Sequence, residues 1–474
     1  MSLPGPDARV VELRVPGLVG ITGEQLLDSV AAVTVAGDES GELVRPADRL
    51  RRPAPGPVLQ ALGRSLPRTL EGYLWGKMTS GGAVKAAWAL LFPFSLANVA
   101  HGMLPAPSGR AGHALLALCQ AMLRVVGLLL TALLVTQLGV ISLDLLAAQC
   151  LAPGFGCLGW APDWLRANEG IRTAIGLLPP LLVIALLHRV SVVSWKQAGV
   201  RITAATTAAA RAGARGGGRL AGDVLQPSPN AAVLRGLHTI TSLVCAALLP
   251  LGGPFSPPVG GAATGAWTVA VVALLLAAVA VAALDDLAVW LRRLLTPVVR
   301  TVLIVAGVGL VVVAGVVGSP LAQARAGVDA MTEGFLGALL LAWVAFAVLL
   351  APLALLARGG WKHLPHRLRP WLGGWVAAPT ALLACLIGAG FGAGLAISLR
   401  QVLGAAGIAL PLSYGSITLL WGVATVVAAL LWVGLFAVAI PLRKRRRGVP
   451  AIVRLLQRAQ PEQQREAADA WATA

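Results

Sequence analysis

Nine long apolar blocks dominate the sequence after residue 84 and constrain the fold more than any other feature. Several reach the roughly 20 residues that a helix needs to cross a 30 Å hydrocarbon core. Hydrophobic residues make up 57% of the chain and charged residues only 12%, whereas an ordinary globular domain has about 25% charged residues. The sequence therefore predicts an all-α polytopic membrane protein. Its apolar blocks lie near 85–104, 124–143, 171–190, 236–252, 266–284, 301–319, 335–357, 374–396 and 414–441.

Basic residues are concentrated in alternate loops between these blocks. Four loops hold 19 Lys and Arg, and the four loops between them hold only four. The positive-inside rule places the basic set in the cytoplasm. The basic loops are 189–235, 286–300, 358–369 and 443–447, and the others are 144–172, 250–265, 320–334 and 397–413.

One block cannot span the membrane if the N-terminus is cytoplasmic, because nine spans would put every basic loop outside. The block 85–104 is the best candidate, since Pro93 lies at its middle and the polar residues Ser95, Asn98 and His101 follow. A break at proline lets an apolar segment turn back where other protein covers its backbone. We expect eight transmembrane helices, one re-entrant or interfacial hairpin and cytoplasmic N- and C-termini.

Residues 1–84 have the balanced charge of a soluble segment, and no secretory signal pattern is found at their start. The β-branched run 10–15 predicts a strand. Thr22 and Gln25 have capping-box spacing, which predicts a helix from Gly23 to about Val30. Two more strands are expected within 31–46, and the Pro-rich run 51–57 is expected to be a linker. This small α/β cytoplasmic segment would precede a transmembrane domain, 85–442, and a basic then polar tail, 443–474.

The formal charge of +18 does not indicate nucleic-acid binding, because the basic residues occupy short loops between membrane helices. Arginine outnumbers lysine by 33 to 5, and Ala, Gly and Leu are abundant. This composition indicates a bacterial genome of high GC content. The expected location is the bacterial plasma membrane, with the lipid bilayer, and either a membrane-protein partner or a second copy of the chain, as partners.

The stretch "VVELRVPGLVGITGEQLL" (10–27) resembles the N-terminal signature of a group of uncharacterised, multi-pass bacterial membrane proteins whose first strand is similar to that of an α/β-hydrolase. The segment 71–100 resembles the part of that group that leads into the membrane. In the group, the strand ends in His-Gly, a turn that supplies an oxyanion-hole N–H. Here the turn is Pro16-Gly17, and proline has no N–H to donate. The resemblance implies an ancestral hydrolase-like element rather than a working one.

Catalytic and cofactor signatures are absent from the sequence. A hydrolase needs a nucleophile in a pattern such as Gly-x-Ser-x-Gly, which this sequence does not contain. The six histidines lie near helix ends or in basic loops, which predicts an interfacial position. No Cys/His spacing indicates zinc. The sequence thus favours a chain without its own catalysis, cofactor or metal.

Cys150 and Cys157 flank a six-residue loop that the topology places outside the membrane. Such a pair forms a disulfide in an oxidising compartment, and we expect one here. The alternative is two free thiols. The other three cysteines lie in apolar helices, where cysteine behaves as a small hydrophobic residue.

The predicted spans contain few ionisable residues, which argues against an ion-coupled transporter. Asp144 and the pair Asp285 and Asp286 are expected at helix ends, where the pair can neutralise nearby arginines. Gln137 is the most notable polar residue deep in a span and the one candidate for a polar pathway.

Four glycines in 386–399 have the spacing that lets helix backbones approach closely. Gly388 and Gly392 form one pair, and Gly390 and Gly394 form the other. We expect this helix to lie inside the bundle or at a subunit contact.

These observations favour a structural or accessory integral membrane protein without catalysis. One alternative is a transporter or lipid-handling protein for a neutral or amphipathic cargo. A second is a hydrolase-related protein that lacks its catalytic half. A polar cavity that reaches the bilayer midplane would favour the lipid-handling alternative.

Overall fold

The structure is a computed structural model that describes residues 10–14, 22–38, 41–47, 54–61, 64–74, 83–154, 157–211, 230–284, 287–362, 371–403, 408–439 and 442. Contacts divide the chain into two units, residues 1–411 and residues 412–474. The second unit contains α12 (Leu412–Val433) and the π-helical η7 (Gly434–Ala439). The basic tail after residue 442, the loop 212–229 and Asp285 and Asp286 lie outside the described residues.

A small five-stranded sheet forms the N-terminal part of the first unit. Its order is β1-β5-β3-β2, with β4 also paired to β5. β1 and β5 are parallel, with Arg14 opposite Gly72, and the other pairs are antiparallel. The strands are β1 (Val10–Arg14), β2 (Ala32–Asp38), β3 (Gly41–Pro46), β4 (Ala54–Ala61) and β5 (Arg64–Leu74).

The helix α1 (Gly23–Leu27) begins at the predicted capping box. The Thr22 hydroxyl accepts from the backbone N–H of Gln25, and the Gln25 side chain accepts from the N–H of Thr22. The helix packs over Gly72, where an added Cβ would lie 2.9 Å from Leu26. The structure thus confirms the strand predicted at 10–15, the two strands predicted within 31–46 and the helix cap at Thr22, and the helix ends at Leu27.

The expected linker at 51–57 is wrong, because residues 54–61 form the strand β4. Prolines lack the N–H that a central strand donates, but an edge strand tolerates them. Among the described residues, β4 pairs with β5 alone and is thus an edge strand. Its prolines are tolerated because their missing N–H groups are not needed for pairing on the open side. The long strand β5 that follows was also not predicted.

Eight described helices are long and apolar enough to cross a membrane, as expected from the sequence. The chain is thus a multi-pass membrane protein. The candidate spans are Gly109–Cys150, Glu169–Arg189, Ala231–Leu248, Gly261–Ala282, Pro297–Val317, Leu321–Gly360, Ala377–Val402 and Leu412–Leu431.

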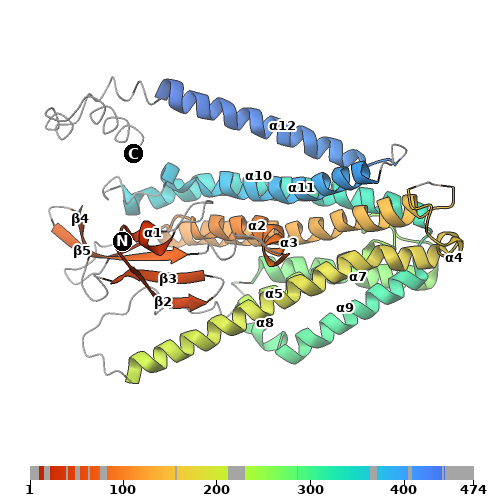
Figure 1. The fold of residues 1–474 in the computed structure, drawn as a ribbon, viewed down its shortest axis with the longest axis horizontal. Coiled ribbons are helices and arrows are strands. Elements are labelled where there is room, and N and C mark those ends of the chain that lie inside the picture. Colours follow the sequence, from red (N-terminus) through yellow and green to blue (C-terminus); the bar gives the residue numbers. More distant parts are fainter. Residues whose placement is uncertain are drawn as a thin grey trace. The chain divides into compact units, whose positions relative to one another are not determined.

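Figure 1 shows the helices of the first unit running alongside one another. The elements are α2 (Ala83–Gly102), α3 (Gly109–Gly139), the π-helix η3 (Val140–Cys150), α4 (Asp163–Ala167), α5 (Glu169–Arg211), α6 (Ala231–Leu248), α7 (Gly261–Ala282), α8 (Ala288–Leu294), α9 (Pro297–Val317), α10 (Leu321–Trp361), η6 (Trp371–Gly374) and α11 (Ala377–Val402).

The predicted break at Pro93 is not present, because residues 83–102 form the single helix α2 with Pro93 inside it. The chain reverses after α2, in the short link to α3. Pro93 lies close to Gly388 of α11, since a Cβ at that glycine would be 3.7 Å from the proline ring. Neighbouring helices can stabilise a helix that contains proline, which explains why the apolar run stays helical.

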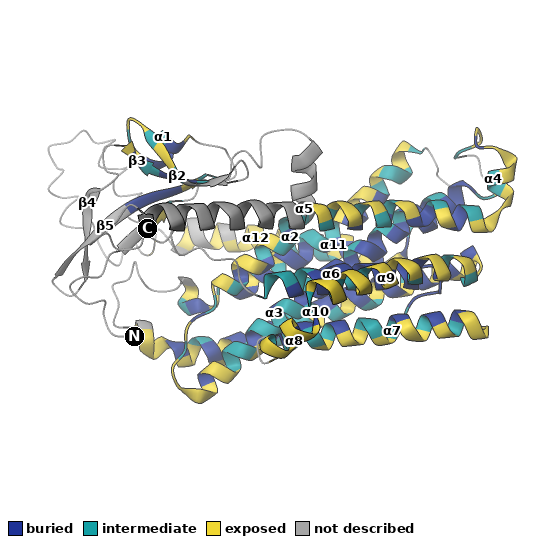
Figure 2. Ribbon diagram, turned by 90° about the horizontal axis from the view of Figure 1, so that it is seen from below, coloured by how far each residue is buried: buried dark blue, intermediate teal, exposed yellow. Residues whose placement is uncertain are grey.

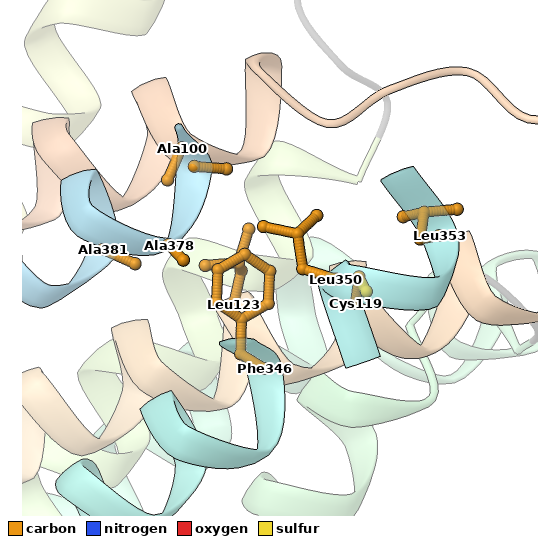
Figure 3. Packing of buried hydrophobic residues seen from close by; sticks show 9 residues of the cluster. Ala100, Cys119, Leu123, Phe346, Leu350, Leu353, Ala378 and Ala381 are labelled. Atoms are coloured by element: carbon orange, nitrogen blue, oxygen red, sulfur yellow. The ribbon is translucent and has the colours of Figure 1, made fainter. Parts of the chain in front are cut away.

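The centre of the bundle is an apolar cluster contributed by α2, α3, α10 and α11 (Figure 3). Phe346 and Leu350 of α10 pack there against Leu123 of α3 and small residues of α2 and α11. By contrast, many apolar residues of α7 and α9 are exposed, as Figure 2 shows. Exposed Val and Leu along whole helices are what a surface facing lipid hydrocarbon requires.

Candidate functional site

A cavity of about 620 Å³ lies between α2, α3, α5 and α6. Along α3 its lining extends from Gln120 to Leu138, a length of about 27 Å at 1.5 Å per residue. The cavity therefore follows the helix axes for most of the thickness of a hydrocarbon core, which is about 30 Å.

The lining of the cavity changes from polar to apolar along its length. We call the end of the bundle that carries Arg189, Arg292, Arg293 and Arg358 the basic end. The arginines and side-chain amides of the lining lie toward the basic end, together with leucines such as Leu123 and Leu234, and apolar residues predominate in the deeper part. The polar group contains Asn98, His101, Gln120, Arg124, His188 and Arg235, and the apolar group contains Leu91, Leu134, Val135, Leu138 and Val183.

His238, in the middle of α6, is held by Thr131 of α3. The Thr131 hydroxyl donates to the carbonyl of Gly127 at 3.0 Å and lies 2.7 Å from Nδ1 of His238. A hydroxyl has one hydrogen, so when Thr131 donates to Gly127, His238 donates from Nδ1 and its Nε2 is the acceptor. The His238 ring also meets Phe94 edge-on, with 6.4 Å between ring centroids.

His188 of α5 has the same arrangement with Thr239 of α6. The Thr239 hydroxyl donates to the carbonyl of Arg235 at 3.0 Å and lies 3.0 Å from Nδ1 of His188. With Thr239 donating to Arg235, the same tautomer follows for His188, with Nδ1 as the donor and Nε2 as the acceptor. Two helix pairs are thus joined by histidine–threonine hydrogen bonds along one side of the cavity.

Arg235 is the cation whose position is best defined at the polar end. One Nη1 hydrogen is donated to the carbonyl of Ser191 at 2.9 Å. Arg300 of α9 lies close by, since its side chain contacts the backbone of Gly236. None of the described residues that line the cavity is acidic. The arrangement attracts an anion because guanidinium groups bind carboxylates and phosphates.

A second polar group lies at the other end of the bundle, around Asp144 in η3. Asp144 is 0% exposed, and its Oδ1 accepts from Nε of Arg325 at 2.9 Å and from Gln149 at 2.7 Å. Gln149 also donates to the carbonyl of Ala409 and accepts from its N–H. Asp144 was expected at a helix end; it lies within the last two turns of the continuous segment Gly109–Cys150, where Arg325 pairs with it.

Gln137 does not line the cavity. Its side-chain nitrogen donates to the carbonyl of Ala389 in α11 at 2.8 Å, and the residue is 1% exposed. The side chain fills the space over Gly392, where an added Cβ would lie 2.3 Å from it. Gln137 thus joins α3 to α11.

The glycines of α11 differ in their surroundings. Gly388 faces Leu130 of α3, which would lie 2.5 Å from an added Cβ. Gly392 is buried and faces Gln137, whereas Gly394 is exposed and would meet no atom within 4 Å. Gly390 is partly buried. Close approach to α3 therefore involves Gly388 and Gly392.

Cys150 and Cys157 are free thiols in this structure, and their side chains contact each other. Cys150 ends η3 and is buried, while Cys157 is partly buried. No disulfide joins them, but their thiols are neighbours.

The histidines were not recognised as site residues from the sequence. His101, His188 and His238 all line the cavity, although interfacial positions were expected. One signal was present in the sequence: Arg235, His238 and Ser242 recur at helical spacing on α6. Such a polar stripe on an apolar helix indicates a face that meets other polar groups.

β5 runs parallel to β1 and ends at Leu74. The sequence from Gly72 to Gly76 has leucine at its centre, so it contains no Gly-x-Ser-x-Gly pattern.

In the part of the chain that the structure describes, no three His, Cys, Asp or Glu side chains come together as a metal site. No protein-family model, curated protein or solved structure matches the chain.

Proposed function

We propose that the chain is a lipid-handling protein of a bacterial plasma membrane that binds an amphipathic molecule with a phosphate head group in the cavity. The observation that carries the proposal is the change of lining, from arginine and histidine at the basic end to leucine and valine deeper in the bundle. A phosphate would lie near Arg235, and an acyl chain would follow Leu134 and Leu138.

The loop charges support the orientation that the proposal requires. With the basic end in the cytoplasm, the head group enters from the cytoplasmic side of the bilayer. Both termini are then cytoplasmic. A purely structural role, favoured by the sequence, does not require a cavity of this length with separate polar and apolar ends.

The size of the cavity agrees with such a ligand. Pockets for small molecules and cofactors measure about 300–1,000 Å³ and are mostly apolar with a few oriented polar groups. The volume of this cavity, about 620 Å³, falls within that range.

Native mass spectrometry of the purified protein tests the proposal. Dioleoyl phosphatidic acid, dioleoyl phosphatidylcholine and dioleoylglycerol are added separately at equal concentration. We expect phosphatidic acid to be retained best. Arg235→Gln should weaken its retention about tenfold, because hydrogen bonds to charged groups contribute roughly 1.5–3 kcal/mol.

Arg292→Gln is the matched control, since Arg292 is exposed at the same end of the bundle but does not line the cavity. Equal losses in the two variants would mean that only diffuse positive charge attracts the lipid. Equal retention of all three lipids by the unmodified protein would contradict the proposal.

A further inference from the structure

Only one of the two carboxylate oxygens of Asp144 accepts hydrogen bonds from the described residues. Its Oδ1 accepts from both Arg325 and Gln149. Its Oδ2 is buried and has no hydrogen-bond partner among the described residues. Buried carboxylate oxygens without a donor are unusual because the group loses water without replacing it.

Asp329 lies one turn beyond Arg325 on α10 and repeats this feature. Its Oδ1 is also buried without a partner in the described part of the chain. Arg325 forms an ion pair with Asp144 and lies one helical turn from Asp329, and its charge acts on both carboxylates. Two carboxylates therefore lie near one guanidinium.

The other charged groups around η3 have separate positions. From α5, Arg172 donates to the carbonyl of Ala147, and Glu169 accepts from the N–H of Leu321. From α10, Glu333 is exposed one turn beyond Asp329. From α11, Arg400 lies in the last turn.

We propose that Asp144 and Asp329 share one exchangeable proton beside Arg325. With both carboxylates ionised, the three side chains carry a net charge of −1, and Asp144 itself is fully buried. Uptake of one proton makes the group neutral. The new O–H can donate to the second carboxylate, which satisfies both partnerless oxygens. Two carboxylates in one site disfavour double ionisation for this reason, and the proton belongs to the pair.

The backbone at this site adds a second reason to assign it a role. Asp144 lies in an 11-residue π-helix that interrupts an otherwise α-helical span. π-Helical segments occur frequently at functional sites. Gln149 connects the carboxylate to Ala409, in the segment that leads toward residue 411. Proton release from the pair would therefore change the charge at a contact between η3 and this segment.

Infrared difference spectroscopy of the purified full chain, titrated with base from neutral pH, tests the inference without any lipid ligand. The C=O stretch of a protonated carboxylic acid should be present at neutral pH and disappear as the pH rises. Asp144→Asn and Asp329→Asn should each abolish this band, because either substitution leaves one carboxylate for one guanidinium. Glu333→Gln should retain it.

Three results would overturn the shared proton. First, the unmodified protein could lack the band, a result that requires no variant. The band could survive in both Asn variants. It could also disappear in Asp144→Asn alone, which would mean that Asp144 is protonated by burial and not by sharing. None of these results depends on the lipid cavity, so failure here leaves the proposed function untouched.

Discussion

His238, His188 and Asp144 each have a polar partner on a different helix. Thr131, Thr239 and Arg325 supply these contacts. Buried polar side chains need such partners because hydrocarbon offers no hydrogen bonds. The pairs fix the orientation of these side chains, and both histidine rings are held by Nδ1. The orientation and hydrogen bonding of these buried side chains thus depend on contacts between helices.

The thiols of Cys150 and Cys157 are predicted to be oxidised to a disulfide in membranes of aerobically grown cells. They are neighbours at the end that we place outside the cytoplasm, and such compartments are oxidising. In denatured protein, a maleimide should label three cysteines before reduction and all five afterwards. Cys119, Cys245 and Cys385 are the internal reference. Labelling of all five before reductant would contradict the prediction.

These residue-scale contacts also show where sequence reasoning was limited. Thr131 and His238 are 107 positions apart, and no local pattern relates them. Asp144 and Arg325 lie on different spans. Hydropathy identifies a polar residue in an apolar helix, but not the neighbour that makes it stable. The cavity could not be predicted, because its four walls are brought together only by helix packing.

The close contact between the helices α3 and α11 depends on glycine residues of α11. Their spacing in the sequence did not distinguish the pair Gly388 and Gly392 from the pair Gly390 and Gly394. Gly388 and Gly392 face α3 closely, because Leu130 and Gln137 project toward them, whereas Gly394 meets no atom within 4 Å. The eight spans, in contrast, could be predicted from apolar length together with loop charge, which excluded the block 85–104.

Gly392→Ala is predicted to destabilise the protein by about 1–3 kcal/mol, the usual cost of overpacking a core. Its new methyl group would overlap Gln137, which is already hydrogen-bonded to Ala389. Thermal unfolding in detergent should show a lower midpoint than for the unmodified protein.

Gly394→Ala is the control on the same helix, because nothing lies within 4 Å of its added Cβ. Alanine favours helix by up to about 1 kcal/mol over glycine, so this variant should be unchanged or slightly more stable. Equal midpoints for the two variants would mean that the α3–α11 contact relaxes around the added methyl.

At the scale of the whole molecule, the orientation in the membrane follows from loop charge. Nineteen basic residues in one set of loops and four in the other predict that the link between α2 and α3 is cytoplasmic. Ser108 is exposed in this link, and Ala167 is exposed at the opposite end of the bundle.

Single cysteines at these positions, in a background without native cysteines, test the orientation. Ser108→Cys should resist a membrane-impermeant thiol reagent in intact cells and react after permeabilisation. Ala167→Cys should react in both conditions. The reverse pattern would invert the protein in the membrane and place the polar mouth of the cavity outside.

The proposed function requires that a lipid tail occupies the apolar part of the cavity, and a comparison of two tryptophan variants of α5 tests this. Val183 lines the apolar part of the cavity, while the adjacent Leu182 is 67% exposed and does not line it. We expect Val183→Trp to fill the tail space and abolish retention of phosphatidic acid in native mass spectrometry, whereas Leu182→Trp should bind it like the unmodified protein. Equal retention by both folded variants would contradict the account.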